Sequence, residues 1–196
     1  MNTKKTLVAL ALGAAILGAG YHMHSGIKRN LDEVKPVKEQ PKYASDVAIP
    51  GAPAPDFSAT SIDGESIKLS NLEGKLVLLD FWAPWCGPCR DLSQHINELS
   101  EKQRNSGLEV IYIAAPSSRK EDIINLREKY NLHYPIIHDE DKTIAKKYGI
   151  SAIPALVLIK DGKINSSRLG YDCFEWIQKL KIDLKSNRGP KYSQNY

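Results

Sequence analysis

The stretch that decides the fold lies at residues 76–89 and reads Leu-Val-Leu-Leu-Asp-Phe-Trp-Ala-Pro-Trp-Cys-Gly-Pro-Cys. Its first seven residues are apolar except Asp80, a pattern typical of a strand buried on both faces of a mostly parallel sheet. A tight turn follows at Ala83-Pro84, and apolar residues then recur at helical spacing, which predicts a helix. Cys86 and Cys89 are therefore expected where this helix begins.

The position of the cysteines at a helix start has a chemical consequence. Free backbone N–H groups and the helix dipole stabilise a thiolate there, and the thiolate is the nucleophile in disulfide exchange. The two-residue spacing lets Cys89 contact Cys86, either to form a disulfide with it or to resolve a mixed disulfide. Pro88 stiffens the first helical turn where no intrahelical donor is lost. The motif thus predicts a redox-active dithiol.

Other uses of the cysteines fit the sequence less well. The chain has three cysteines, and Cys173 stands alone. A disulfide-stabilised secreted scaffold has a larger, even set spread along the chain. A closed zinc site needs four ligands, whereas the single Cys-x-x-Cys supplies two. We therefore predict no metal site, and no cofactor other than the redox-active Cys86–Cys89 disulfide.

Outward from this stretch, short apolar strands alternate with helical patterns. Asp63-Gly64 and Asp161-Gly162 are hairpin turn signals between alternating segments. This order predicts an α/β sandwich in which helices flank a mixed central sheet. The expected strands are 57–60, 67–69, 76–82, 108–114, 134–138, 155–159 and 163–169. The expected helices are one that follows the cysteines and includes 92–103, and three more at 123–130, 143–148 and 174–184.

The N-terminal region predicts export. Lys4 and Lys5 precede an apolar run at residues 6–21, which is the layout of a secretory signal. The run falls short of the roughly 20 residues that span a bilayer. Two interpretations stay open: a cleaved signal peptide, or an uncleaved membrane anchor through residues 6–23. Both place the rest of the chain in the periplasm or another extracytoplasmic space.

Composition and charge complete the domain organisation. Apolar residues make up 42% of the chain and charged residues 26%, values typical of a protein with a packed core. The net charge of +4 is scattered and forms no basic stripe, so no nucleic-acid partner is predicted. The expected parts are a signal or anchor at 1–23, a proline-rich linker at 24–52, the domain at 53–185 and a flexible tail at 186–196.

Several of these segments resemble a known family. Residues 80–89 resemble the active-site segment of thioredoxin, and residues 148–154 resemble the thioredoxin segment that ends in a cis-proline. The segments 54–75 and 108–139 are instead similar to the exported TlpA/ResA-like branch of this fold. The resemblance covers residues 53–185 and implies a thioredoxin-like sandwich with an N-terminal hairpin and an extra strand–helix insertion.

The resemblance implies a role for each catalytic residue. Cys86 would be the attacking thiolate, Cys89 the resolving thiol, and Asp80 the group that takes and returns the proton of Cys89. Desolvation raises the pKa of a carboxylate in an apolar strand, which suits a general base near neutrality. The alternative interpretation is a buried acid satisfied by a hydroxyl or a water.

The resemblance also implies a substrate groove. A cis Pro154 would present the Ile153 backbone to an extended substrate strand, and Gly170 resembles the glycine that lines this groove. Cys173 has two interpretations: a thiol whose pKa the last helix lowers, or a semi-buried thiol without a role. The predicted substrate-binding residues are Trp85, Gly87, Pro88, Ile153, Pro154 and Gly170.

The leading function is a reductase of disulfides in exported proteins. The Gly-Pro pair between the cysteines resembles thioredoxin, whose potential is about −270 mV, against about −120 mV for the oxidant DsbA. Such a reductant needs an electron donor in the membrane. A disulfide oxidase or isomerase and a copper-binding chaperone on the same fold are the alternatives. A peroxidase is disfavoured because Ala83, not Thr or Ser, stands three residues before Cys86.

Overall fold

The computed structural model describes residues 48–103 and 107–185. The predicted signal or anchor at residues 1–23, most of the linker and the tail at 186–196 lie outside the described residues. Of the helices that are described, none has both the length and the apolar character needed to cross a membrane.

A five-stranded mixed sheet forms the centre of the domain, in the order β5-β4-β3-β6-β7. Strand β3 pairs in parallel with β4 and antiparallel with β6, while β5 and β7 continue the sheet on either side. The predicted mixed sheet is therefore confirmed. Its strands are β3 (Leu76–Trp82), β4 (Leu108–Ala114), β5 (Ile136–His138), β6 (Ala155–Lys160) and β7 (Lys163–Leu169).

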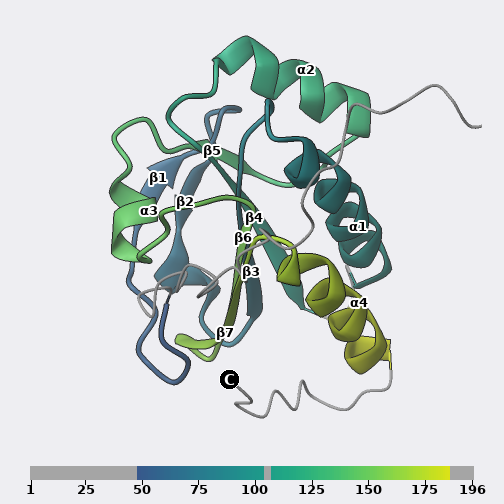
Figure 1. Ribbon diagram of the computed structural model, residues 1–196. Helices are drawn as coiled ribbons and strands as arrows, with labels where there is room; N and C mark the ends of the chain where they lie inside the picture. The colour runs from purple at the N-terminus through teal and green to yellow at the C-terminus, as the bar shows by residue number, and fades with distance from the viewer. Residues whose placement is uncertain (1–47, 104–106, 186–196) are drawn as a thin grey trace, which may run out of the picture. The chain divides into compact units, whose positions relative to one another are not determined.

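Helices cover this sheet as predicted. Figure 1 shows α1 and α4 side by side on one side of the sheet, and α3 on the other side with the hairpin of β1 and β2. The β1–β2 hairpin is antiparallel, and the Ile62 N–H next to it donates to the Ile136 carbonyl of β5 at 2.8 Å. The remaining elements are α1 (Gly87–Gln103), α2 (Lys120–Tyr130), α3 (Thr143–Lys147), α4 (Asp172–Lys185), β1 (Ser58–Thr60), β2 (Ser66–Lys68) and a 3₁₀ turn, η2 (Leu69–Leu72).

The side-chain alternation of β3 explains why this strand is apolar throughout. Val77, Leu79 and Phe81 pack into the core cluster on the α3 side, whereas Leu78 and Trp82 pack into the cluster with α1, α2 and α4. Because both faces are covered, both sets must be apolar. Asp80 lies between Leu78 and Trp82 and so faces the side that holds α1, the helix of the cysteines.

Packing of the domain begins earlier than the predicted boundary at residue 53. Ala48 is buried, and its N–H donates to the Tyr148 carbonyl at 3.2 Å. The Gly51 N–H then donates to the Ile164 carbonyl at 2.8 Å, so this segment runs along the outer edge of β7. The last residues of the predicted linker are thus part of the packed structure.

Candidate redox site

Cys86 occupies the N-cap position of α1. Its carbonyl accepts the Arg90 N–H at 3.1 Å, which is the first intrahelical bond, and its Sγ accepts the Cys89 N–H at 3.2 Å. The sulfur therefore takes the place that a serine or aspartate oxygen has in an ordinary N-cap. In the reduced protein the same N–H and the helix dipole would stabilise a negative charge on this sulfur.

The two cysteines differ in their access to solvent. They are joined by a disulfide, and Cys86 is 8% exposed while Cys89 is fully buried. Attack on a protein substrate needs a sulfur that can be reached from outside. The structure therefore brings the predicted pair together and leaves Cys86 as the sulfur that a substrate can reach.

Asp80 is a buried carboxylate without a hydrogen bond. It is 1% exposed, and neither of its oxygens has a hydrogen-bond partner among the described residues. Desolvation raises its pKa well above the ordinary value. No hydroxyl of the described part of the chain donates a hydrogen bond to this acid, as one alternative interpretation required.

The peptide bond between Ile153 and Pro154 is cis. In the sheet register Phe81 lies opposite Ala155, and Ala155 lies opposite Leu169. Pro154 is therefore located between the loop that follows β3 and the turn that follows β7. Its carbonyl accepts the Gly170 N–H at 2.8 Å. The predicted groove residues Ile153, Pro154 and Gly170 therefore lie at the same end of the strands as the cysteine loop, which is the loop from the end of β3 to Cys86.

The other predicted groove residues lie on or next to the first turn of α1. Trp85 is 60% exposed, Pro88 is exposed and Gly87 is half-buried. Trp82 is instead fully buried and makes an edge-to-face contact with Tyr112, with ring centroids 5.9 Å apart. Trp85 thus forms part of the surface beside the disulfide, whereas Trp82 belongs to the core beneath it.

Comparison with known proteins agrees with this geometry. The model of the AhpC/TSA family matches residues 50–167. The chain belongs to the AhpC/TSA family. The thiol-disulfide oxidoreductase ResA of Bacillus thuringiensis (strain Al Hakam) is 35% identical over 131 residues, which are 65% of this chain and 74% of that protein.

Two further likenesses concern sequence and fold. ResA of Bacillus subtilis (strain 168) is 30% identical over 115 residues, 58% of this chain and 64% of that protein. A solved structure, a proposed DsbE thiol:disulfide interchange protein from Chlorobium tepidum, is 28% identical, with a TM-score of 0.62. The matched region covers 70% of this chain and 99% of the Chlorobium tepidum chain. This AhpC/TSA-family protein is a thiol–disulfide oxidoreductase with the thioredoxin fold, as the resemblance predicted.

The structure contradicts one of the two interpretations of Cys173. It is fully buried, and its Sγ lies 3.7 Å from the Pro154 carbonyl oxygen, to which it donates. Burial, with a smaller contribution from the charge of Asp80, raises the pKa of this thiol to about 12. The full burial of Cys173 therefore contradicts the interpretation in which the start of α4 lowers this pKa, because desolvation disfavours the thiolate.

Sequence reasoning missed two residues around the site of this AhpC/TSA-family protein. Arg90 Nη1 donates to the Pro84 carbonyl at 3.0 Å, which places a positive charge beside the cysteine turn. Its position four residues after Cys86 was the available signal, because such residues share a helix face. Tyr112 lies opposite Asp80 in the register, and its hydroxyl donates to the Ser93 carbonyl at 3.4 Å.

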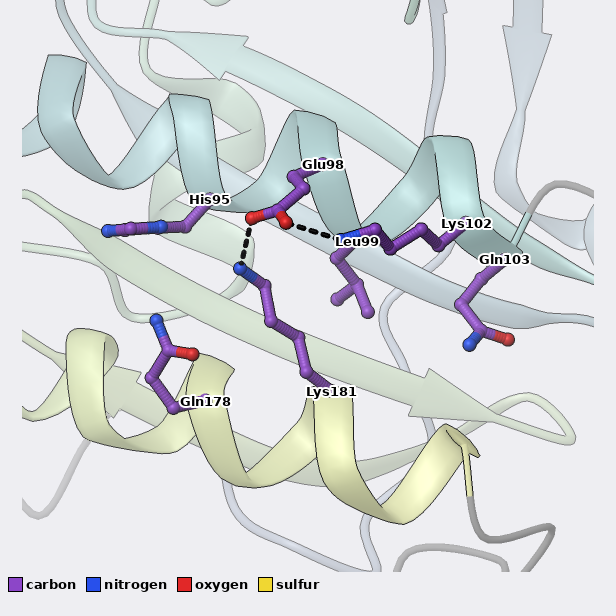
Figure 2. Close-up of a pocket in the computed structure, with 7 residues that line it drawn as sticks. All are labelled: His95, Glu98, Leu99, Lys102, Gln103, Gln178 and Lys181. Carbon is purple, nitrogen blue, oxygen red and sulfur yellow. Dashed lines mark hydrogen bonds and ion pairs between the residues drawn. The ribbon is translucent and has the colours of Figure 1, made fainter.

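A pocket of about 400 Å³ lies between α1 and α4, and neither cysteine is among the residues that line it (Figure 2). Glu98 accepts from Lys102 on its own helix and from Lys181 of α4, at 2.9 Å in the second case. These two partners lower the pKa of Glu98 to about 2. Glu98 is about 16 Å along the helix from Gly87, at about 1.5 Å per residue. The pocket therefore lies between the two helices and is not part of the redox site.

Proposed function

We propose that this chain is a reductase of disulfides in exported proteins, working through a Cys86/Cys89 dithiol–disulfide cycle. The single observation that supports it most is the N-cap geometry, in which a reachable Cys86 Sγ accepts the Cys89 N–H. Burial raises the pKa of Asp80, and its strand neighbours Leu78 and Trp82 pack into the same core cluster as Cys86 and Cys89, which supports a base on this side of the sheet. The likeness to ResA proteins supports the same chemistry.

The proposed cycle transfers two electrons to the substrate. The Cys86 thiolate attacks one sulfur of a substrate disulfide, forms a mixed disulfide and releases the other substrate sulfur as a thiolate. Cys89 gives its proton to Asp80 and attacks Cys86 Sγ, which breaks the mixed disulfide and releases the second substrate sulfur as a thiolate. Asp80 then returns the proton, and the substrate leaves as a thiol. A dithiol donor, which we place in the membrane, then reduces the Cys86–Cys89 disulfide again.

The direction of this reaction is set by the reduction potential. Gly87 and Pro88 separate the cysteines, as in thioredoxin, and no histidine stands between them to favour an oxidase. We therefore expect a potential near that of thioredoxin, about −270 mV, rather than near −120 mV as in DsbA. Equilibration with glutathione or dithiothreitol buffers of known ratio, followed by thiol alkylation, measures it. A value close to −120 mV would replace the reductase by the oxidase alternative.

Export is a separate part of the proposal. It is supported by Lys4, Lys5 and the apolar run that follows them. An alkaline phosphatase reporter, which is active only outside the cytoplasm, is expected to be active when fused after residue 60. The same fusion without residues 2–23 is the control and should be inactive. Activity that does not depend on these residues would contradict the prediction.

A further inference from the structure

Two exposed aromatic side chains, those of Trp85 and Tyr171, lie in the segments that carry the predicted substrate-binding residues of the proposed reductase. Among the described residues the large hydrophobic side chains that are exposed are those of Ile49, Trp85, Ile124 and Tyr171. Tyr171 is 81% exposed and directly follows Gly170, and it is not among the residues predicted to bind substrate. Single exposed apolar side chains are ordinary on a protein surface, so exposure alone does not indicate a binding role. The position of Tyr171 has to supply that argument.

The sheet register places the loops that carry Trp85 and Tyr171 on opposite sides of Pro154. Because Phe81, Ala155 and Leu169 lie side by side on β3, β6 and β7, the next positions Trp82, Pro154 and Gly170 are also neighbours. Neighbouring strands are about 4.8 Å apart, so the loops after β3 and β7 are separated by about 10 Å. Trp85 lies in the first loop and Tyr171 in the second.

The backbone around Tyr171 is held by hydrogen bonds on both sides. The Gly170 N–H donates to the Pro154 carbonyl at 2.8 Å, and the Gly170 carbonyl accepts the Cys173 N–H at 3.2 Å. The Tyr171 carbonyl accepts the Phe174 N–H at 3.1 Å. Gly170 has a φ of +65°, a conformation that favours glycine over residues with a side chain. The ring of Tyr171 therefore projects into solvent from a fixed backbone.

We propose that Tyr171 is a specificity-determining residue, which together with Trp85 binds an aromatic or large aliphatic side chain close to the reacting cysteine of an extended substrate segment. This inference rests on the proposed function. The occupant is a protein substrate, because its sulfur has to reach Cys86 and its backbone then passes Pro154 between the two rings. An aromatic ring on a fixed backbone offers much contact area at little cost in conformational entropy.

Single-turnover reduction by the fully reduced protein tests this inference without any external donor. The substrates are two cyclic peptides with the same disulfide, one with phenylalanine and one with serine next to the cysteine, and hydroxyethyl disulfide. We expect Tyr171→Ala to lower the second-order rate constant for the phenylalanine peptide about fivefold, since an aromatic contact contributes about 1 kcal/mol. The serine peptide and hydroxyethyl disulfide should change by less than about twofold.

Two variants act as controls. Tyr171→Phe keeps the ring and should retain the rate with the phenylalanine peptide, and Ile124→Ala removes an exposed side chain on α2 and should change none of the three rates. Equal rates of the wild type and Tyr171→Ala with the phenylalanine peptide would overturn the inference. Failure of the wild-type dithiol to reduce even hydroxyethyl disulfide would instead overturn the proposed function, so the two failures can be told apart.

Discussion

Replacing Cys86 by serine is expected to abolish disulfide reduction, with a rate at least about a thousandfold below that of the wild type. Cys86 is the sulfur that solvent reaches, and its Sγ accepts the Cys89 N–H at the start of α1. A serine hydroxyl is protonated at neutral pH, so no nucleophile replaces the thiolate. In the reduced wild type, iodoacetamide should modify Cys86 first, with a pH midpoint below the ordinary thiol value of about 8.5.

The partner variant separates the roles of the two cysteines. Cys89→Ala should form mixed disulfides that persist, because the thiol that resolves them is missing. Cys173→Ser is the matched control: it also removes a buried cysteine, yet it should keep most of the activity. Mass spectrometry of the trapped adducts shows which sulfur holds the substrate. If Cys86→Ser traps partners and Cys89→Ala does not, the assignment of the two roles is reversed.

Asp80→Asn is expected to slow the decay of the mixed disulfide about a hundredfold, which is the lower end of the effect of general base catalysis. Cys89 has to lose its proton before it attacks, and in our proposal the Asp80 carboxylate takes it. The first attack by Cys86 should change by less than about threefold, because that sulfur is already stabilised as a thiolate by the helix start. Stopped-flow fluorescence with a substrate peptide resolves the two steps, and equal decay rates in both proteins would refute the role of Asp80.

The same variant should change the pH dependence of stability. Burial raises the pKa of Asp80 in the folded protein, whereas the unfolded carboxyl has a pKa of about 3.9. The unfolded chain therefore releases this proton first, and the folded state loses stability as pH rises from about 4 toward the folded pKa. Asparagine does not ionise, so Asp80→Asn should be at least as stable as the wild type at pH 8. Urea unfolding at pH 5 and pH 8 measures this, and a variant that is clearly less stable at pH 8 would contradict it.

Much of the fold was predictable because local patterns agreed with the tertiary structure. β3 and β4 have the bounds that their apolar runs predict, and both hairpins turn at the expected Asp-Gly pairs. Most other elements differ from their predicted bounds at one or both ends. For example, β5 begins at Ile136 rather than Tyr134, α2 begins at Lys120 rather than Ile123, and α4 begins at Asp172 rather than Phe174. Such ends depend on single hydrogen bonds and not on a repeated pattern.

The parts of the site that were missed depend on contacts between distant segments. Tyr112 lies beside Asp80 only because of the β3–β4 register. Tyr171 lies near the loop that follows β3 only because a single strand, β6, lies between β3 and β7. No spacing within either segment reports such a neighbour. The burial of Cys173 was different, since it shares helical spacing with Trp176, Ile177 and Leu180, all of which are buried.

The charge pairs of Glu98, one within α1 and one from α1 to α4, have a consequence for the pH dependence of stability. Glu98 holds both lysines as an anion, and its lowered pKa means that its contribution is complete above about pH 4.5 and is lost only as pH falls toward 2. Asp80 has the opposite dependence, since its protonation in acid relieves a buried charge. Acidification therefore strengthens the folded state at the centre of the sheet before it weakens the surface link between the helices. The two carboxylates therefore change the stability of the fold in opposite directions as pH falls.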